Sequence, residues 1–438
     1  MPLKIIVGCQ KGDEGKGKLV DRELTLGHFT WNVRFQGGRN AGHTVQVGDQ
    51  QIILHLIPSG VHHKNVQLGL GPGVIFDPQG FFEEVDELKS FGIEVEGRLW
   101  VSPAAKLVMP WDKVLDGAID QVRAEAQGKT VQAGGGVGTT NRGIGPAYAN
   151  AIARDGLTVA HLLNPEILRQ RLGTVVPVIN RILNAFGCPE TSVQEVFDLY
   201  APLGECLRKF TKPLSQGLVQ SLEKDQWILV EGGQGAFLSV DCGVSYPCCT
   251  SSITTSNAVF AGLGLPLVPE WIGPIVGVVK AYQTAVGNHP MPTLIGGEVE
   301  ERIRQRGKEF GATTGRPRHC CWINGLELVR GVWINGCTEI VITKLDVLDE
   351  EPAIPIARAL RYNNYEIHEL PSTLEEYLRC EPVYDQAMSG WQKDTSGVSK
   401  FSNLPEEAWN YLKQLEIIAG VPITGVSNGP QRDQFCVA

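Results

Sequence analysis

The sequence predicts an α/β fold, built as a single large domain around a mainly parallel β-sheet. Short apolar runs bounded by glycine recur along the chain, and such runs are typical of strands that are buried on both faces. Stretches with helical periodicity separate these runs, and this alternation is the usual pattern of α/β proteins. The predicted strands are Ile5–Gly8, Val66–Leu70, Trp227–Val230, Ile275–Val279 and Ile340–Thr343.

The predicted helices lie between and after these strands. One runs from Asp112 to Gln127, and a longer helical tract runs from about Pro165 to Lys224. A third helix starts at Pro405, has acidic residues in its first turn and stops at Gly420. Acidic first turns and terminal glycines are common helix boundary signals.

The chain is long enough for a large buried core, with 438 residues of which 42% are apolar. No internal repeat, low-complexity tract or Ser/Gly linker divides it. We therefore predict one domain over residues 1–438, with helical insertions at about 109–127 and 161–225.

The charge distribution argues against a nucleic-acid surface. The net charge is −9 and the pI is near 5.6. Residues of both signs are dispersed without a basic stripe, so we expect no nucleic-acid partner. A net-negative protein that binds anions must concentrate positive charge locally.

The cysteine pattern and the first residues indicate a cytoplasmic protein. Eleven cysteines occur at irregular spacings, including the adjacent pairs Cys248-Cys249 and Cys320-Cys321. This is unlike the disulfide framework of a short secreted protein, so we expect reduced thiols. A strand-like segment follows Met1, and no apolar stretch of 18 residues occurs. We therefore expect neither a signal peptide nor a membrane span.

A glycine-rich loop follows the first predicted strand. Gly12–Lys18 fits the phosphate-binding pattern G-x-x-x-x-G-K, in which backbone N–H groups and the next helix's positive end face phosphate oxygens. Position 19 is leucine, where this motif normally has a Ser or Thr that binds Mg²⁺. The metal then needs another ligand, and Asp13 is the nearest carboxylate. The alternative is a tight turn with solvated lysines, because such motifs also occur by chance.

A second glycine-rich stretch, Gly37–Thr44, contains His43 among small residues. A lone histidine is more often structural than catalytic. Here it is expected in a loop with little apolar bulk to bury it, which favours a functional role.

These two stretches resemble the first two signatures of the adenylosuccinate synthetase family, and further matches follow in that family's order over essentially the whole chain. The matching segments are Gly12–Lys18, Asn40–Thr44, Gly138–Tyr148, Glu231–Gly235, Thr250–Ser252, Lys280–Tyr282, Glu309–Arg316, Thr343–Asp349 and Gly429–Pro430. The resemblance implies a GTP-dependent ligase that joins L-aspartate to C6 of IMP, through a 6-phosphoryl intermediate, in purine nucleotide biosynthesis.

The resemblance also implies the catalytic groups. In the family's reaction the purine N1 proton is removed, O6 attacks the γ-phosphoryl group of GTP, and the aspartate amine then displaces phosphate at C6. Asp13 matches the base, and with Gly42 it matches the ligands of one Mg²⁺ per subunit. Lys16 matches the phosphate cradle, and His43 matches a group that stabilises charge on the transferred phosphoryl.

Substrate contacts are implied in the same way. The GTP set is Gly12, Gly15, Lys16, Gly17, Lys18, Gly42, Thr44, Lys344, Asp346, Ser427, Gly429 and Pro430. The acceptor-nucleotide set is Asn40, Thr140, Arg154, Gln234 and Thr250. The aspartate set is Arg142, Thr313, Thr314, Arg316 and Arg318. Arg154 matches an arginine that reaches the IMP phosphate from a neighbouring subunit, so a homodimer is expected.

Some of these assignments have a reason in the side-chain chemistry. The Asp346 carboxylate can accept from guanine N1–H and the 2-amino group, whereas adenine would leave it unpaired, which favours GTP over ATP. Lys344 can lie along the base plane. Arg316 and Arg318 can fork onto the carboxylates of a dicarboxylic substrate. Taken alone, their segment would more often be a solvated basic turn.

The sequence departs from the family pattern at several positions. The departures are Lys11 for Trp, Asn141 for Gly, Ala285 for Arg, Cys242 for His and Ile253 for Asn. Two alternatives therefore stay open: the same chemistry on GMP or dGMP, giving a succinylated 2-aminopurine nucleotide, and a catalytically poor, nucleotide-binding regulatory paralogue. Retention of Asp13 and His43 favours the active IMP enzyme. An NTPase that drives motion would have no use for the later motifs.

Overall fold

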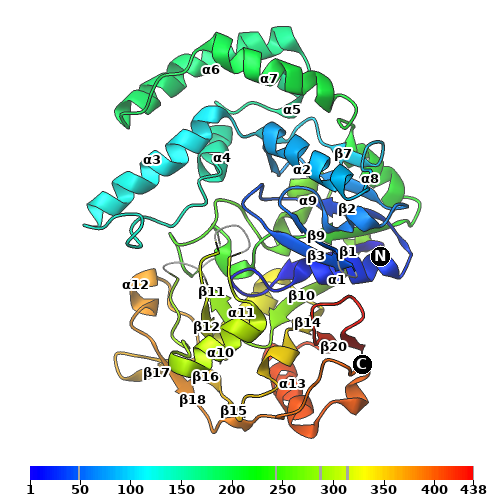
Figure 1. Cartoon of the computed structure of the whole chain (residues 1–438), viewed down its shortest axis with the longest axis vertical. Coiled ribbons are helices and arrows are strands. Elements are labelled where there is room, and N and C mark those ends of the chain that lie inside the picture. The colour runs from blue at the N-terminus through cyan, green and yellow to red at the C-terminus, as the bar shows by residue number, and fades with distance from the viewer. Residues whose placement is uncertain (48–49, 242–243, 286–288, 312–314, 438) are drawn as a thin grey trace.

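The computed structural model describes residues 1–47, 50–241, 244–285, 289–311 and 315–437. Within these residues the central sheet has the strand order β21-β20-β14-β10-β1-β9-β2-β5-β7. Neighbouring strands run parallel, except that β20 and β21 are antiparallel. The predicted α/β class and mainly parallel sheet are confirmed (Figure 1).

The predicted strands all belong to this sheet. Its members are β1 (Leu3–Gly8), β2 (Phe29–Arg34), β5 (Gln67–Leu70), β7 (Leu99–Val101), β9 (Trp227–Glu231), β10 (Ile272–Lys280), β14 (Glu339–Thr343), β20 (Ile423–Ser427) and β21 (Phe435–Val437). The sequence analysis missed β2 because Asn32 and Arg34 interrupt its apolar pattern. Both polar side chains are buried.

Helices cover both faces of the sheet. Leu19, Val20 and Leu24 of α1 (Lys16–Thr25) share a core cluster with Ile6 of β1. The other face of β1 belongs to a larger cluster, which also contains apolar side chains of α8 (Leu214–Leu222), α9 (Val259–Leu263), α11 (Gly325–Asn335) and α13 (Glu406–Ala419). Helix α13 corresponds to the helix that was predicted to start at Pro405 and stop at Gly420.

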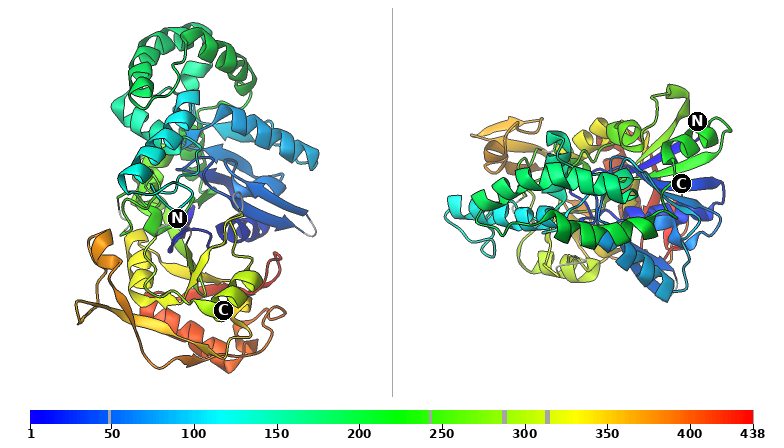
Figure 2. Two further views of the ribbon diagram at one scale, coloured as in Figure 1. Left: turned by 60° about the vertical axis from the view of Figure 1, so that its left-hand side comes forward. Right: turned by 90° about the horizontal axis from the view of Figure 1, so that it is seen from above.

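A helical region lies beyond the β7 edge, at one end of the elongated molecule (Figures 1 and 2). It contains α3 (Pro110–Ala126), α4 (Ile144–Ala153), α5 (Val159–Leu162), α6 (Pro165–Ala185) and α7 (Val193–Leu207). The predicted tract 165–224 thus comprises α6, α7 and α8. Pro110 occupies the first turn of α3, where a missing N–H costs nothing, so this helix starts earlier than predicted.

A smaller sheet lies at the opposite end, where β16 (Ile356–Tyr362) pairs with β13 (Ile323–Asn324), β17 (Tyr365–Ile367) and β18 (Glu381–Tyr384). The remaining elements are β3 (His43–Val47), β4 (Gln50–Leu54), β6 (Ile75–Phe76), β8 (Lys106–Leu107), β11 (Gln283–Ala285), β12 (His319–Cys321), β15 (Ala353–Ile354), β19 (Met388–Ser389), α2 (Pro78–Ser90), α10 (Gly297–Gly307) and α12 (Leu374–Tyr377). Among the described residues, no helix has the length and apolar character needed to span a membrane.

Candidate active site

The predicted site residues follow strands of the parallel sheet. Parallel strands end at one edge, where open α/β sheets bind ligands. The loop after β1 carries Asp13, that after β2 carries Asn40, and that after β9 carries Gln234. The residues after β14 include Asp346, and those after β20 include Gly429. The fold therefore gathers segments far apart in the sequence.

The phosphate loop joins β1 to α1. Gly12 and Gly15 have φ of 89° and 85°, a left-handed conformation that favours glycine. The Lys16 Nζ lies 2.6 Å from Glu14 Oε2. Glu14 Oε1 accepts from the N–H groups of Gln10 at 3.1 Å and Gly12 at 2.9 Å. The predicted cradle thus surrounds a buried carboxylate, which the sequence analysis missed although it lies inside the motif.

Asp13 is the accessible carboxylate of this loop. Its side chain is 40% exposed and its φ is 58°. The Asp13 Oδ2 lies 3.0 Å from Nη2 of Arg318. Arg318 was predicted to bind aspartate, but here it is buried and its Nη1 donates to Glu309 Oε2 at 2.8 Å. It therefore joins the phosphate loop to Glu309.

Glu309 is the centre of a buried charge network. The Nζ atoms of Lys280 and Lys344 lie 3.3 and 2.7 Å from its Oε1, and the Tyr282 hydroxyl donates to the same oxygen at 2.6 Å. Burial alone would raise the pKa of Glu309, but Lys280, Lys344 and Arg318 hold it well below its usual range. Lys344 was predicted to lie along the guanine plane; its ammonium here contacts Glu309 and the Gly307 carbonyl.

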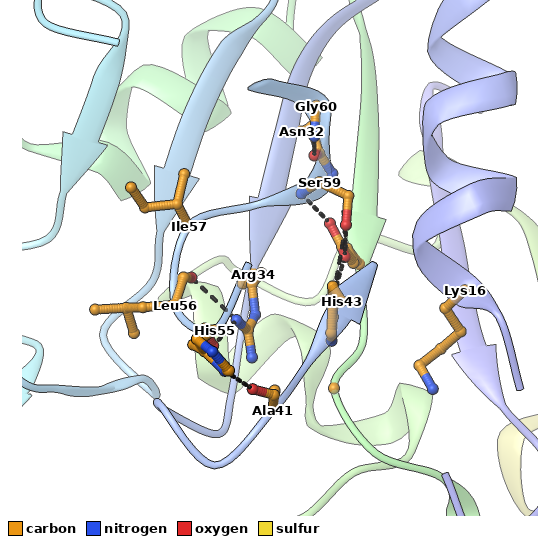
Figure 3. Close-up of polar contacts among 12 residues, drawn as sticks. Lys16, Asn32, Arg34, Ala41, His43, His55, Leu56, Ile57, Ser59 and Gly60 are labelled. Carbon is orange, nitrogen blue, oxygen red and sulfur yellow. Dashed lines mark hydrogen bonds and ion pairs between the residues drawn. The ribbon is translucent and has the colours of Figure 1, made fainter. Parts of the chain in front are cut away.

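His43 lies in an environment that differs from the prediction. It is the first residue of β3 and only 6% exposed, not a loop residue without cover. Its Nδ1 hydrogen-bonds Glu231 at the end of β9, and the Ser59 hydroxyl and N–H donate to the same carboxylate, the N–H at 2.8 Å (Figure 3). The expected exposure was wrong because Glu231, 188 positions away, supplies a buried partner.

The electrostatics of this pair follow from burial and contact. Burial alone would raise the pKa of Glu231, but His43, Arg34 and Ser59 lower it to about 2. Glu231 is therefore an anion at neutral pH. Burial is also the main influence on His43 and lowers its pKa below the ordinary value. A carboxylate on Nδ1 fixes the ring orientation and leaves Nε2 for another partner.

The predicted guanine residues lie beside α1. Lys18 Nζ donates to Ser427 Oγ at 2.8 Å, Gly429 O at 2.5 Å and Gln434 O at 2.8 Å. Lys18 thus fixes the loop after β20. The Asp346 Oδ1 is buried and has no hydrogen-bond partner among the described residues. Burial first, and then the charge of Asp349, raises the pKa of Asp346 to about 6.

The predicted acceptor residues come together in part. The Asn40 Nδ2 donates to Thr250 Oγ1 at 3.1 Å. Both side-chain amide atoms of Gln234 are buried and have no partner within the described chain. Unpaired buried polar atoms are costly, so Gln234 has unused capacity to bind a polar ligand. Thr140 is exposed and Arg142 is half-buried.

Other predicted contacts are less well placed. Thr313 and Thr314 lie outside the described residues. Arg316 is exposed. Arg154 is also exposed and ends α4 with a φ of 71°.

Some departures from the family pattern have a structural setting. Lys11 is buried and its Nζ lies 2.6 Å from both carboxylate oxygens of Glu327. Gln283 donates to the same carboxylate at 2.7 Å. Asn141 has a φ of 56°, and asparagine tolerates this conformation better than most residues. Cys242 lies outside the described residues.

The donor set near the loop fits a magnesium ion. Among the described residues no group of three or more His, Cys, Asp or Glu side chains could hold a metal. Mg²⁺ commonly takes only one or two protein carboxylates and completes its shell with phosphates and water. The partly exposed Asp13 carboxylate and the Gly42 carbonyl are hard oxygen donors of this kind.

Comparisons with known proteins match nearly the whole chain. A sequence model of the family described as adenylosuccinate synthetase matches residues 5–436. The adenylosuccinate synthetase of Geotalea uraniireducens is 41% identical over 432 residues, covering 98% of this chain and 97% of that protein. That of Salinibacter ruber is 39% identical and covers 99% of this chain and 98% of its own length.

Solved structures extend the comparison to the fold. The fully ligated adenylosuccinate synthetase of Plasmodium falciparum superposes with a TM-score of 0.91 at 32% identity, with 100% of each chain covered. The cyanophage S-2L succinoaminodeoxyadenylate synthetase, bound to dGMP and dATP, has a TM-score of 0.61 at 18% identity, covering 99% of this chain and 94% of its own. This second likeness concerns the fold alone.

The matches span nearly the whole chain and include the loops that carry the site. The chain therefore belongs to the adenylosuccinate synthetase family, the GTP-dependent ligases that join aspartate to IMP in purine biosynthesis.

Proposed function

We propose that Asp13, His43 and Lys16 are the catalytic groups of this ligase. The observation that carries the proposal is the contrast between the two carboxylates of the phosphate loop. Glu14 is buried with its oxygens hydrogen-bonded, whereas Asp13 is 40% exposed and held by Arg318. Asp13 is therefore the carboxylate able to reach a substrate proton.

In the first step, Asp13 accepts the proton from N1 of IMP, and O6 attacks the γ-phosphorus of GTP. The O6–P bond forms as the bond from phosphorus to the bridging oxygen breaks, and GDP leaves. Phosphoryl transfer needs mainly positioning and charge neutralisation. Lys16 supplies positive charge after exchanging Glu14 for phosphate oxygens.

His43 has a more specific role in this step. Its Nδ1 faces Glu231, so a ring protonated only at Nδ1 would present an acceptor at Nε2. Donation from Nε2 to the leaving oxygen needs the doubly protonated ring. The Glu231 anion and the bound phosphates both favour that cation. His43 thus takes up a proton when GTP binds and stabilises the charge that develops on GDP.

In the second step, the amine of aspartate attacks C6. The C6–N bond forms, the C6–O6 bond breaks, and phosphate leaves with the oxygen that was O6, taking up the proton that the amine loses. We assign the aspartate carboxylates to Arg142, Arg316 and Arg318 with the hydroxyls of Thr313 and Thr314, and Arg318 would exchange its contact with Asp13 for the ligand. Arginine forks suit such carboxylates.

The remaining assignments concern the nucleotides and the metal. Asp346 and Lys344, with Ser427, Gly429 and Pro430, form the guanine side, and Gly12, Gly15, Gly17, Lys18 and Thr44 belong to the same GTP site. Asn40, Thr140, Gln234 and Thr250 bind IMP. Asp13 and the Gly42 carbonyl would hold one Mg²⁺ per subunit, which supplies charge neutralisation on the phosphates.

We also propose the assembly and setting. Arg154 is exposed at the end of α4 and completes the IMP phosphate site of a partner in a symmetric homodimer. The described cysteines are free thiols, as suits a cytoplasmic enzyme. Residues 1–438 act as one domain.

The test is phosphate release with GTP, Mg²⁺ and aspartate, against a panel of IMP, GMP, dGMP and XMP. We expect release with IMP, with formation of the succinylated product. Asp13→Asn should abolish it without unfolding the protein, because an amide is a far poorer base. If Asp13→Asn kept a turnover within about tenfold of wild type, a barrier difference of roughly 1.4 kcal/mol, Asp13 could not be the base. Preference for GMP or dGMP would reassign the acceptor.

A further inference from the structure

We propose that Glu84 is a positioning residue for His43, although it lies on α2 and is not part of the substrate site. It acts through residues 55–60, the segment between β4 and β5. The inference rests on the role of His43 in the proposed function and adds the buried polar network that holds this histidine in place. Figure 3 shows the part of this network that contains Arg34, His55 and Ser59.

The Glu84 carboxylate holds the backbone amides at the start of this segment. It accepts from His55 N at 3.2 Å, Leu56 N at 3.0 Å and Ile57 N at 2.9 Å. The residue is 3% exposed. A carboxylate this deeply buried is costly unless it is hydrogen-bonded, and these contacts all go to one short stretch of backbone.

Arg34 holds the carbonyls of the same stretch. Its Nη1 donates to His55 O at 2.8 Å and Leu56 O at 3.0 Å, and the residue is 0% exposed. Figure 3 shows Arg34 beside residues 55–57. Glu84 and Arg34 therefore fix the segment from two sides, by its donors and by its acceptors.

The next residues connect this stretch to the partner of His43. Pro58 has no N–H to satisfy. The Ser59 N–H and hydroxyl both donate to Glu231, and Gly60 N donates to Asn32 Oδ1 at 2.8 Å. The segment thus presents Ser59 to the carboxylate that orients the imidazole.

A second connection reaches the loop that precedes His43. The His55 Nδ1 lies 2.7 Å from Ala41 O, a hydrogen bond from the imidazole to that carbonyl. Residues 55–60 therefore reach His43 directly, because Ser59 Oγ lies 3.5 Å from His43 Nδ1, and indirectly, through Glu231 at the ring and through Ala41 in the backbone. Fixing the segment fixes the position of the imidazole.

Loss of these contacts should affect the transition state more than substrate binding. Catalytic groups must be held within about 0.5 Å of the productive geometry, and a displacement of about 1 Å can cost roughly 100-fold in rate. GTP and IMP are bound mainly by groups that residues 55–60 do not contact. The effect should therefore appear in kcat.

The variant to test is Glu84→Gln. Glutamine keeps the shape but offers one acceptor oxygen and an NH₂ group, which faces backbone donors and cannot pair with them. We expect kcat to fall roughly 10- to 100-fold with KM values changed by less than about threefold. The matched control is Glu87→Gln, an exposed residue of the same helix, which should retain wild-type kcat.

A double-mutant cycle with His43→Asn separates positioning from general damage. If Glu84 acts through His43, adding Glu84→Gln to His43→Asn should cost no further activity. Equal losses in both backgrounds would overturn the inference while leaving His43 catalytic. Near-normal activity of His43→Asn alone would instead refute the proposed role of His43, and the inference with it.

A second variant covers the case in which Glu84→Gln does not fold. Ser59→Ala removes the hydroxyl, which donates to Glu231 and lies 3.5 Å from His43 Nδ1, and keeps the backbone N–H contact to Glu231. Ser59→Ala should lower kcat in the protein that retains His43. It should have no further effect when it is added to His43→Asn. Additive losses in this cycle would also overturn the inference.

Discussion

Asp346→Asn is a direct test of how the protein selects guanine. The Asp346 Oδ1 is buried and unpaired among the described residues, so GTP would satisfy it through N1–H and the 2-amino group. An asparagine amide presents one donor where the carboxylate presents an acceptor. The variant therefore loses one hydrogen bond to a charged group and places two N–H donors against each other.

The expected loss follows from these contacts. A hydrogen bond to a charged group contributes about 1.5–3 kcal/mol, which corresponds to a roughly 10- to 150-fold increase in the Kd of GTP. XTP has an acceptor at position 2, which can receive the new amide N–H. Asp346→Asn should therefore bind XTP more tightly than the wild type does.

Titration calorimetry of both nucleotides with both proteins measures this exchange. The assignment of Asp346 to guanine would be refuted if Asp346→Asn bound GTP as tightly as the wild-type protein does. It would also be refuted if the wild-type protein preferred ATP to GTP. The pH dependence gives a second check. Because burial raises the pKa of Asp346 to about 6, its carboxylate becomes protonated in the free protein below that pH. GTP binding should weaken as the pH falls from 7 to 5, and Asp346→Asn should lack this component.

Other predictions concern different parts of the site. GTP binding should be accompanied by proton uptake at His43, which makes the calorimetric binding enthalpy depend on the ionisation enthalpy of the buffer. His43→Asn should lose this dependence. If the variant kept it unchanged, proton uptake at His43 would be refuted. Arg316→Leu should raise the aspartate KM strongly and leave the GTP and IMP KM values nearly unchanged; an equal rise in all of them would indicate a phosphate or folding role. Mixing inactive Asp13→Ala and Arg154→Ala subunits should restore roughly a quarter of the sites by random pairing, and no recovery despite subunit exchange would refute a shared site.

Local patterns predicted much of the fold. Short, mainly apolar runs correctly identified β1, β5, β9, β10 and β14, because strands buried on both faces are rich in apolar side chains. This rule failed for β2, where Asn32 donates its side-chain amide to Leu229 O and Arg34 reaches the carbonyls of residues 55–56. Buried polar residues with distant partners cannot be recognised from a local window.

The site was harder to predict for the same reason. The glycine-rich loops and Asp346 were found in sequence, but their partners depend on contacts between distant segments. His43 was predicted to lie uncovered, because its partners Glu231 and Ser59 lie 188 and 16 positions away in the chain. Arg318 was assigned to aspartate without its contact to Glu309. The roles of Glu14 and Glu84 were not predicted, since neither carboxylate differs from a surface residue until its buried donors are known.

Transfer of O6 to phosphate distinguishes the proposed reaction from direct displacement at C6, and an isotope measurement detects this transfer. The experiment uses IMP labelled with ¹⁸O at position 6, together with GTP, Mg²⁺, aspartate and the wild-type protein. The released inorganic phosphate is then analysed by mass spectrometry. We predict one ¹⁸O atom in the phosphate for each succinylated product formed, because O6 becomes bonded to the γ-phosphorus before C6 is attacked. Product formation with unlabelled phosphate and ¹⁸O released as water would rule out a 6-phosphoryl intermediate.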